Sequence, residues 1–297
     1  MKHIIVLGAG VTGLTTALLL KQKGYEQVTV VAKHIPGDMN IEYTSPYAGA
    51  HWRTMAKNND KLLQTFDATS YHKFLALAKK DTGVIIVPSY DYYDDDSLPE
   101  IYDPWFKDTV LDFKLLQEKD GLPQGAKIGH TYTTGLGARF LGGVQDKNVF
   151  PTRGQTVIVR ASHIKETMTH IGVHGITYII PRSDGTVVLG GTSNKDDFNP
   201  FVDDQTTEKI IKRTTQLCPK LVAEKPLEII RCAVGLRPTR INGPRFENET
   251  IFKGQKKIQV THAYGHGGFG YQSSWGSAEY VIQLMEQGFK EKNSSHL

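Results

Sequence analysis

Near its N-terminus the chain reads Ile4-Ile5-Val6-Leu7-Gly8-Ala9-Gly10-Val11-Thr12-Gly13, four apolar residues followed by a turn with three glycines. The apolar run predicts a buried strand, and Leu14–Leu20 continues as an apolar helix. In this strand–turn–helix context the first glycine allows a tight turn, the second lets the backbone approach a pyrophosphate, and the third lets the helix pack closely on the strand. These residues therefore predict a Rossmann-type dinucleotide site, with an ordinary tight turn as the alternative.

The following residues extend this unit but depart from its usual pattern at one place. Gly24 ends the helix, and Val28–Val31 predicts a second strand. Dinucleotide-binding folds carry an acidic residue after that strand, where it holds the ribose hydroxyl. Here the chain has Ala32-Lys33-His34 instead. Lys33 either favours a phosphate or is simply solvated, so these residues predict no specific ribose contact.

A second glycine-rich segment lies close to the C-terminus. It reads Tyr264-Gly265-His266-Gly267-Gly268-Phe269-Gly270-Tyr271-Gln272 and follows a predicted strand, Ile258–Thr261. A helix predicted over residues 274–287 comes next, so backbone N–H groups and a helix N-terminus can face a negatively charged ligand. Aromatic residues alternate with the glycines, which argues against a merely flexible surface loop. The segment is therefore predicted to bind a ligand.

One arginine stands out between apolar residues and a proline, in Val234-Gly235-Leu236-Arg237-Pro238-Thr239-Arg240. A guanidinium held in a fixed position can bind a carboxylate through two parallel hydrogen bonds. Taken alone, the pattern fits an arginine in a surface loop at least as well.

Composition places the chain among ordinary folded proteins. Its 297 residues suffice for about two domains, and the 39% hydrophobic and 22% charged content is typical of a soluble globular protein. No run approaches the roughly 18 apolar residues of a membrane span, so no membrane partner is expected. The net charge of +4 is dispersed, and Lys253-Gly254-Gln255-Lys256-Lys257 predicts a solvated turn rather than a nucleic-acid patch. Cys218 and Cys232 are predicted to be thiols.

Between the two glycine-rich segments the pattern alternates helices and strands. Helices are predicted over residues 60–80 and 206–217, and the turn Ser183-Asp184-Gly185 predicts a hairpin between strands Thr177–Ile180 and Val187–Leu189. The acidic and aromatic run Tyr90-Asp91-Tyr92-Tyr93-Asp94-Asp95-Asp96 is interpreted as a solvated loop. It lacks a ligand-like spacing with histidine, so no metal site is predicted.

Together these motifs resemble the D-amino-acid oxidase family, which includes the D-aspartate oxidases. The matching strings follow the family's order over nearly the whole chain: Val6–Leu14, Thr44-Ser45-Pro46-Tyr47-Ala48-Gly49-Ala50-His51-Trp52, Arg153-Gly154-Gln155-Thr156, Tyr178-Ile179-Ile180-Pro181-Arg182, Gly190-Gly191-Thr192, Gly235-Leu236-Arg237-Pro238 and the Tyr264–Gly276 loop. Each string is unspecific alone, but the ordered set is specific.

The resemblance implies roles for individual residues and FAD as the cofactor. Arg237 matches the arginine that pairs with the substrate α-carboxylate, and Tyr178 matches a tyrosine whose hydroxyl touches the same group. Gly268 matches the glycine whose carbonyl receives the substrate amino group. The FAD-contacting positions implied are Gly8, Ala9, Gly10, Val11, Thr12, Gly13, Thr44, Ser45, Ala48, Gly49, Ala50, Gly267, Gly270 and Gln272.

The resemblance also implies a fold and an activity. The expected fold is α/β, with a Rossmann-type FAD-binding domain (residues 1–55, 131–155 and 238–297) interleaved with a mixed-sheet substrate domain (residues 56–130 and 156–237). The expected activity is oxidative deamination of a D-amino acid, with oxygen as acceptor and an imino or 2-oxo acid, ammonia and hydrogen peroxide as products. Orientation of the substrate over the flavin is then the protein's main contribution. A D-aspartate oxidase is one alternative, and the positions of Arg237 and Tyr178 argue against another, a glycine or sarcosine oxidase.

The match to the family is interrupted in the middle of the chain. After Tyr132-Thr133-Thr134 the family continues through a helix and several strands, whereas here Thr134 runs directly into Gly135. A segment of strand–helix–strand size is missing, and its loss is expected to expose sheet edges of the flavin domain. The chain is therefore expected to bind flavin poorly. A degenerate, non-catalytic flavoprotein or a splice variant is the alternative function.

Two further expectations concern the substrate and the location in the cell. His51 and Ser193 fall near the place where the substrate side chain points in the family, and a cationic His51 with Ser193 would suit D-aspartate or D-glutamate. The alternative is a neutral His51 packed beside Trp52. The terminal Ser295-His296-Leu297 resembles the peroxisomal import signal, which implies a peroxisomal location and an import receptor as partner. The resemblance leaves a homodimer open.

Overall fold

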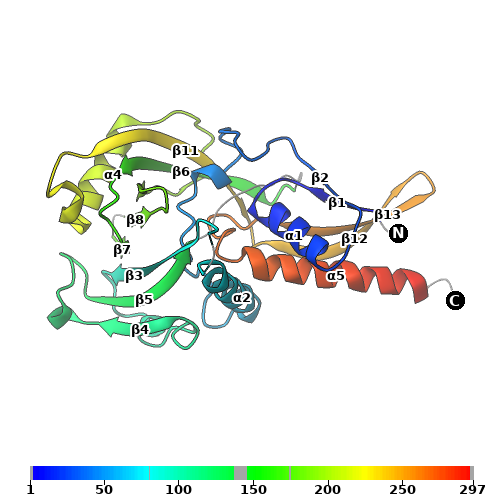
Figure 1. The fold of residues 1–297 in the computed structure, drawn as a ribbon, viewed down its shortest axis with the longest axis horizontal. Helices are drawn as coiled ribbons and strands as arrows, with labels where there is room; N and C mark the ends of the chain where they lie inside the picture. The colour runs from blue at the N-terminus through cyan, green and yellow to red at the C-terminus, as the bar shows by residue number, and fades with distance from the viewer. Residues whose placement is uncertain (1–2, 80, 137–145, 174, 295–297) are drawn as a thin grey trace.

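The computed structural model describes residues 3–79, 81–136, 146–173 and 175–294, and Figure 1 shows two lobes side by side. One lobe contains a large mixed β-sheet and helix α4 (Asp204–Leu217). The other contains helices α1 (Val11–Gln22) and α5 (Ser274–Ser294) with two small sheets. Helix α2 (Lys61–Leu77) lies below the junction of the lobes in this view and contacts α5.

The predicted strand–turn–helix–strand order of the N-terminal unit is confirmed, but the first strand is only partly buried, contrary to the prediction. Strand β1 (Ile4–Leu7) pairs in parallel with β2 (Val28–Val31), and α1 connects them. The apolar residues of α1 pack with those of α5 around Leu20 and Ile282, which are both almost fully buried. Gly24, with a φ of 88°, ends the helical segment in the left-handed conformation that glycine adopts without strain. The strand–turn–helix motif therefore has the context that a dinucleotide site requires.

The large sheet has nine strands and confirms the mixed α/β fold. Their order is β10-β6-β9-β8-β7-β3-β5-β4, with β11 also paired to β6. The strands are β3 (Ile85–Tyr93), β4 (Leu111–Leu116), β5 (Ile128–Leu136), β6 (Val149–Arg160), β7 (Thr167–Gly172), β8 (Gly175–Pro181), β9 (Thr186–Gly190), β10 (Asn194–Lys195) and β11 (Glu228–Arg240). A short helix α3 (Pro99–Tyr102) and the 3-10 turns Ser45–Tyr47, Glu118–Asp120 and Pro219–Val222 complete the elements of the connections.

Helix α4 covers one part of this sheet. It begins after Asp203, whose carboxylate accepts a hydrogen bond from the Thr206 N–H at 2.7 Å and so caps the helix. Ile210 is fully buried against a cluster that includes Val157, Ile179 and Leu189 from three strands. The predicted hairpin is also confirmed, because β8 and β9 pair antiparallel around the turn at Asp184. This apolar layer fixes the strands that carry Tyr178 and the glycines after β9.

The acidic and aromatic run from Tyr90 to Asp96 was wrongly interpreted as a solvated loop. Its first four residues lie in β3, and Asp91 is only 1% exposed. The Asp91 carboxylate receives the Arg53 Nε–H at 2.9 Å and the Tyr132 hydroxyl at 3.1 Å. A buried charge with these partners costs far less than an isolated one. The interpretation as a loop failed because Asp91 points into the protein, where its partners Arg53 and Tyr132 come from distant parts of the chain.

The lobe with α1 and α5 contains two separate small sheets. Strands β12 (Arg245–Lys253) and β13 (Lys256–Tyr264) form an antiparallel pair, and among the described residues no strand joins this pair to β1 and β2. Ile5 and Leu7 of β1 are 56% and 66% exposed, which is unusual for apolar residues of a Rossmann-type strand. Both side chains point to the same face of the small sheet, so this face, rather than a sheet edge, is left uncovered.

The Thr134–Gly135 junction itself lies inside a regular strand. Thr134 pairs with Val87 and Gly135 with Ile86, so β5 continues through the junction without a break. The residues that follow, 137–145, lie outside the described part of the chain. The large sheet is therefore intact at the junction.

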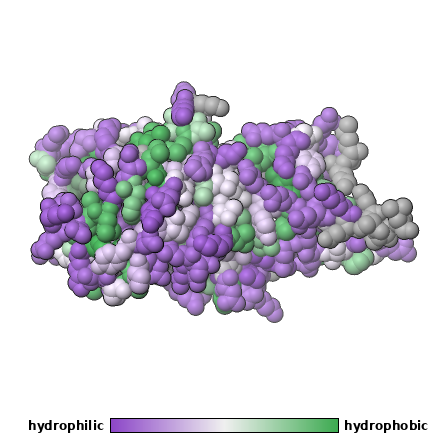
Figure 2. Space-filling view, turned by 90° about the horizontal axis from the view of Figure 1, so that it is seen from below, coloured by the Kyte–Doolittle hydropathy of each residue, from purple (hydrophilic) through white to green (hydrophobic). Residues whose placement is uncertain are grey.

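The surface matches the composition. In the view of Figure 2, apolar patches are interrupted by hydrophilic residues. The Lys253–Lys257 turn between β12 and β13 is exposed, as predicted. None of the helices in the described ranges has the length and hydrophobicity for a membrane crossing. Cys218 and Cys232 are free thiols, and the described residues include no cluster of metal-ligating side chains.

Candidate functional site

The glycine-rich turn between β1 and α1 has the geometry of a phosphate site. Gly8 has a φ of 105° and its N–H donates to the Val31 carbonyl at 2.7 Å. A Cβ on Gly13 would collide with the Gly8 carbonyl oxygen, so only glycine allows this close approach of helix and turn. Gly10 caps α1 without a side chain, and the first turn of the helix contains no acidic residue. The N-terminal N–H groups of α1 are therefore compatible with a pyrophosphate.

The segment from Thr44 to Ala50 brings a second part of the chain to this region. Ser45 contributes its carbonyl, which accepts the Tyr271 hydroxyl of the C-terminal loop at 3.3 Å. A Cβ on Gly49 would lie 2.5 Å from Cδ1 of Ile180, so any side chain here would force the Ile180 side chain to shift. Ala50 has a φ of 61°, which an alanine rarely adopts. Unusual backbone of this kind concentrates at ligand sites, and Ala48 to Ala50 were predicted to contact FAD.

The C-terminal glycine loop packs against the end of β11. The Gly267 N–H donates to the Pro238 carbonyl at 2.9 Å, and Gly267 has a φ of 53°. His266 is buried, and burial lowers the pKa of its imidazole to about 4, so it is neutral at physiological pH. Its Nε2 is a buried atom without a hydrogen-bond partner among the described residues, as are Nε2 of Gln272 and Oγ of Ser274.

These observations fit FAD. Buried polar atoms without partners are costly unless a ligand satisfies them, and here three such atoms lie in the loop predicted to contact the flavin. The ribose end is less well defined. Lys33 forms an ion pair with Glu42 at 2.5 Å, and Glu42 also faces His34, but the Lys33 side chain is 72% exposed, which agrees with the alternative of a solvated lysine.

The predicted substrate-binding residues converge on the turn after β9. The Arg237 guanidinium lies over Gly154 of β6, where a Cβ would collide with it, and its Nη1–H donates to the Thr192 carbonyl at 2.9 Å. Tyr178 packs its ring on Gly190 and Gly191, and a Cβ on Gly191 would lie 2.6 Å from the Tyr178 hydroxyl. Arg237 and Tyr178 are 59 residues apart in the sequence, yet they contact adjacent residues of one turn.

Gly268 and Ser193 lie at the edge of the same region. Gly268 is exposed, and a Cβ there would be 3.5 Å from Cδ of Arg237, so the glycine loop approaches the arginine stem. Ser193 is exposed and follows Thr192, whose hydroxyl accepts the Gln155 N–H at 2.8 Å. The structure thus brings Arg237, Tyr178 and Gly268 around the residues 190–193.

His51 does not have the character that an acidic substrate would need. It is 9% exposed, and its Nε2 lies 3.1 Å from the Ser89 hydroxyl and 3.2 Å from the Thr167 hydroxyl. Burial lowers the pKa of His51 to about 4, against the weaker opposing effect of Asp91. Of the two alternatives, a cationic or a neutral His51, the structure favours the neutral one near neutral pH, because the desolvation of the ring outweighs the attraction of the nearby carboxylate.

Sequence reasoning assigned no role to two arginines that support this site. Arg213 of α4 donates from Nη2 to the Gly191 carbonyl at 3.2 Å and so helps to fix the turn that receives Tyr178 and Arg237. Arg153, only 3% exposed, donates to the carbonyls of Asn199 and Phe201. Both arginines act on backbone carbonyls of loops that are distant in sequence, and a local pattern does not reveal such partners.

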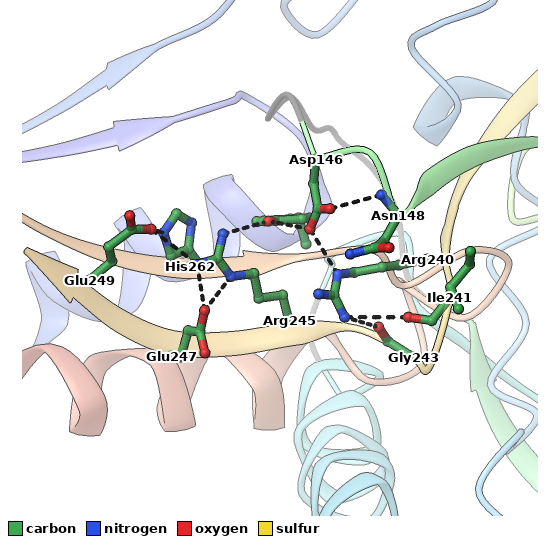
Figure 3. A network of polar contacts seen from close by, with 10 residues as sticks. Asp146, Asn148, Arg240, Ile241, Gly243, Arg245, Glu247, Glu249 and His262 are labelled. Carbon is green, nitrogen blue, oxygen red and sulfur yellow. Dashed lines mark hydrogen bonds and ion pairs between the residues drawn. The ribbon is translucent and has the colours of Figure 1, made fainter. Parts of the chain in front are cut away.

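A polar network stabilises the end of β11 beyond Arg237 (Figure 3). Asp146 accepts the Arg240 Nε–H at 2.9 Å and the Tyr264 hydroxyl at 2.8 Å, and these bonds hold the pKa of its carboxyl well below the usual range. Arg245 extends the network to Glu249 at 3.0 Å, and Glu249 lies 2.8 Å from Nε2 of His262. The network connects Asp146 to β11 through Arg240 and to β13 through Tyr264. It therefore anchors the strand that carries Arg237 and the strand that leads into the glycine loop.

Comparison with known proteins decides the family. The sequence profile of the family described as FAD dependent oxidoreductase matches residues 3–124 and 132–284. The chain belongs to this family of FAD-dependent oxidoreductases. A D-amino-acid oxidase of Schizosaccharomyces pombe is 32% identical, covering 95% of this chain and 96% of its own, and a D-aspartate oxidase of Cryptococcus neoformans is 29% identical, covering 95% and 96%. The solved structure of glycine oxidase from Bacillus cereus superposes with a TM-score of 0.72 at 18% identity, covering 97% and 96%, which shows a shared fold.

The same comparison bears on the shortened connection. The alignment with the S. pombe protein spans 338 positions, whereas this chain has 297 residues, so that relative contains at least 41 residues without a counterpart here. The profile match leaves residues 125–131 unmatched and runs through the Thr134–Gly135 junction without a break. The alignment length agrees with a segment missing from this chain, and its place at that junction stays a prediction.

Proposed function

We propose that this flavoenzyme oxidatively deaminates D-amino acids, with oxygen as electron acceptor and hydrogen peroxide, ammonia and a 2-oxo acid as products. The observation that carries the proposal is the meeting of Arg237 and Tyr178 at the Gly190–Thr192 turn, next to Gly268 of the glycine loop. The D-amino-acid oxidase and D-aspartate oxidase relatives support it over nearly the full chain.

The residues of the chain serve to bind and orient the substrate. One N–H of Arg237 is bonded to the Thr192 carbonyl, and the guanidinium has further donors for a substrate carboxylate. The Tyr178 hydroxyl can donate to the same carboxylate, and the exposed Gly268 carbonyl can accept an amino N–H. FAD, when bound, supplies the hydride acceptor. Because the reacting C–H bond needs orientation rather than proton transfer from a side chain, a site without a general base is sufficient.

A neutral D-amino acid is the favoured substrate class. A neutral, buried His51 that already faces Ser89 and Thr167 offers no cation to a side-chain carboxylate. The test is a peroxide assay with D-alanine, D-methionine and D-aspartate on the purified, FAD-loaded chain, together with an L-alanine control. The proposed class predicts that D-aspartate is the poorest of the three D-substrates. A clear preference for D-aspartate would instead support the D-aspartate oxidase alternative.

A second candidate function is a non-catalytic or degenerate flavoprotein. The observation that favours it is the separation of β1–β2 from β12–β13, with Ile5 and Leu7 exposed. In this case FAD binds weakly and no peroxide forms. A flavin absorbance spectrum after gel filtration distinguishes the two candidates, because a catalytic chain retains FAD at close to one per chain.

The peroxisomal location is proposed from the terminal Ser295-His296-Leu297, which lies outside the described residues. An enzyme that releases hydrogen peroxide would suit this compartment. A fluorescent protein that ends in residues 286–297 should enter peroxisomes, and the same fusion without the last three residues should not. A diffuse distribution of both fusions would refute the location.

A further inference from the structure

Helix α2 packs directly on the loop predicted to hold the flavin. The Ser70 hydroxyl is fully buried and accepts the N–H groups of Trp275 and Gly276, both at 3.1 Å. These are N–H groups of the first turn of α5, which have no partner within the helix, so Ser70 acts as a cap supplied by another helix. A Cβ on Gly276 would collide with the backbone of Phe66. The position of the glycine loop is therefore set by α2.

Asp67 lies three residues before Ser70, on the same face of α2. Its side chain is 1% exposed, and its Oδ2 accepts the Thr54 hydroxyl at 2.6 Å. Its main-chain carbonyl accepts the Trp52 indole N–H at 2.9 Å. The carboxyl thus sits between the glycine loop, which was predicted to contact FAD, and the Trp52–Thr54 segment, which closely follows the predicted FAD contact Ala50.

Gln272 of the glycine loop faces this carboxyl. The Gln272 side chain is 5% exposed and close enough to Asp67 to lower the pKa of its carboxyl, against the larger opposing effect of burial. Yet Oδ1 of Asp67 and Nε2 of Gln272 are both buried without a hydrogen bond of normal geometry within the described residues. Two buried polar groups that face each other in this way need only a proton or a small rotation to pair.

The surroundings of Asp67 bring the pKa of its carboxyl close to neutral pH. Burial raises its pKa to about 7, and Asp60 at the start of α2 adds to this effect. The Met55 N–H and the Thr54 hydroxyl oppose it from the neighbouring segment. On the glycine loop, His266 is neutral above about pH 4. The nearby cation Arg53 is already paired with Asp91.

We propose that Asp67 is a positioning residue whose proton sets the direction of the Gln272 amide, and through it the affinity of the glycine loop for FAD. An ionised Asp67 accepts an N–H from Gln272 and turns the amide oxygen toward the loop. A protonated Asp67 donates to the amide oxygen and turns the N–H₂ group toward the loop. The pyrimidine edge of a flavin carries two carbonyl oxygens, which accept hydrogen bonds, and one N–H, which donates, so an N–H₂ group turned toward it finds more partners and the protonated state favours the cofactor. This inference rests on flavin binding by the chain and adds a pH dependence to it.

The experiment measures two properties between pH 5.5 and 8.5. The first is the tryptophan fluorescence of the FAD-free chain, because Trp52 bonds to Asp67 and Trp275 to Ser70. The second is the dissociation constant of FAD by titration. We expect a fluorescence midpoint near neutral pH and an FAD affinity about fivefold lower at the alkaline end, which corresponds to one net hydrogen bond.

The variants separate the proton of Asp67 from its packing. Asp67→Asn should abolish both pH dependences. Thr54→Val removes a donor to the carboxylate, so it should move the fluorescence midpoint to higher pH. Asp60→Asn is the matched control: it changes an acid to an amide on the same helix, keeps a good N-cap, and should retain the midpoint with at most a small decrease.

Each outcome bears on the inference. A pH dependence that persists in Asp67→Asn, or a midpoint that Thr54→Val leaves in place, overturns it even if one of the two variants fails to fold. A chain that binds no FAD at any pH refutes the proposed function and the flavin part of the inference, and the fluorescence titration then still shows whether Asp67 controls the loop. A wild-type chain without any fluorescence transition overturns the inference completely.

Discussion

Substitution of Arg53 by methionine provides a sharp test of how this fold tolerates buried charge. Arg53 donates from Nε to Asp91 at 2.9 Å, and the side chains of the two residues are only 16% and 2% exposed. The adjacent carboxylate raises the pKa of the guanidinium, which therefore stays charged in spite of burial. Arg53→Met keeps much of the side-chain volume but leaves Asp91 as a buried carboxylate without its cation.

The expected cost follows from this burial. Removing one partner of a buried ion pair destabilises a protein by about 3–5 kcal/mol, because the remaining charge is uncompensated. The Tyr132 hydroxyl, 3.1 Å from Asp91, compensates only part of that charge. The unfolding entropy of about 2.1 cal/mol/K per residue gives about 0.6 kcal/mol/K for 297 residues. The melting temperature should therefore fall by about 5–8 °C.

Arg160→Met is the matched control. Arg160 donates from Nε to Glu228 at the same distance, 2.9 Å, but the side chains of the two residues are 53% and 50% exposed. An exposed pair contributes about 0–1 kcal/mol, so this variant should melt within about 2 °C of the wild type. Thermal unfolding followed by circular dichroism at pH 7.5 measures both. If the two variants lower the melting temperature equally, burial does not determine the strength of these pairs and the reasoning is wrong.

Three other substitutions test the site. Arg237→Ala should lower kcat/KM by more than about 30-fold, which corresponds to the loss of about 2–5 kcal/mol from an unpaired carboxylate, while the flavin spectrum of the bound cofactor stays unchanged; near-normal kcat/KM would exclude a role in substrate binding. Folding lowers the pKa of His51 from 6.5 to about 4, so its stabilising contribution is complete above pH 6.5 and is lost as the pH falls toward 4; relative to His51→Gln, the wild type should lose about 3 kcal/mol of unfolding free energy over this range, and parallel pH profiles in urea denaturation would contradict this. Gly49→Val would place a branched side chain against Ile180, and we expect a loss of about 1–3 kcal/mol together with weaker FAD binding; a variant as stable as the wild type would show that the contact can relax.

Local sequence determined the elements whose partners are close in the chain. The β1–α1–β2 unit formed as predicted because the apolar strand, the glycine turn and the helix lie within residues 4–31 and specify each other. The same holds for helix α2 and for the β8–β9 hairpin, where a single turn aligns two adjacent strands. The ordered set of motifs also identified the family, although no motif alone was sufficient.

Tertiary structure alone decided which polar groups are buried and whether they carry a charge. Asp91 was placed in a solvated loop, yet β3 turns it into the core, where Arg53, 38 residues away, neutralises it. From the sequence His51 could be charged or neutral, and its burial against Thr167 of a distant strand favours the neutral form. Protonation depends on the groups that the fold brings within a few ångströms, and such distances are not encoded in the neighbouring residues. For the same reason the convergence of Arg237 and Tyr178 on one turn became visible only when β8, β9 and β11 were placed in one sheet.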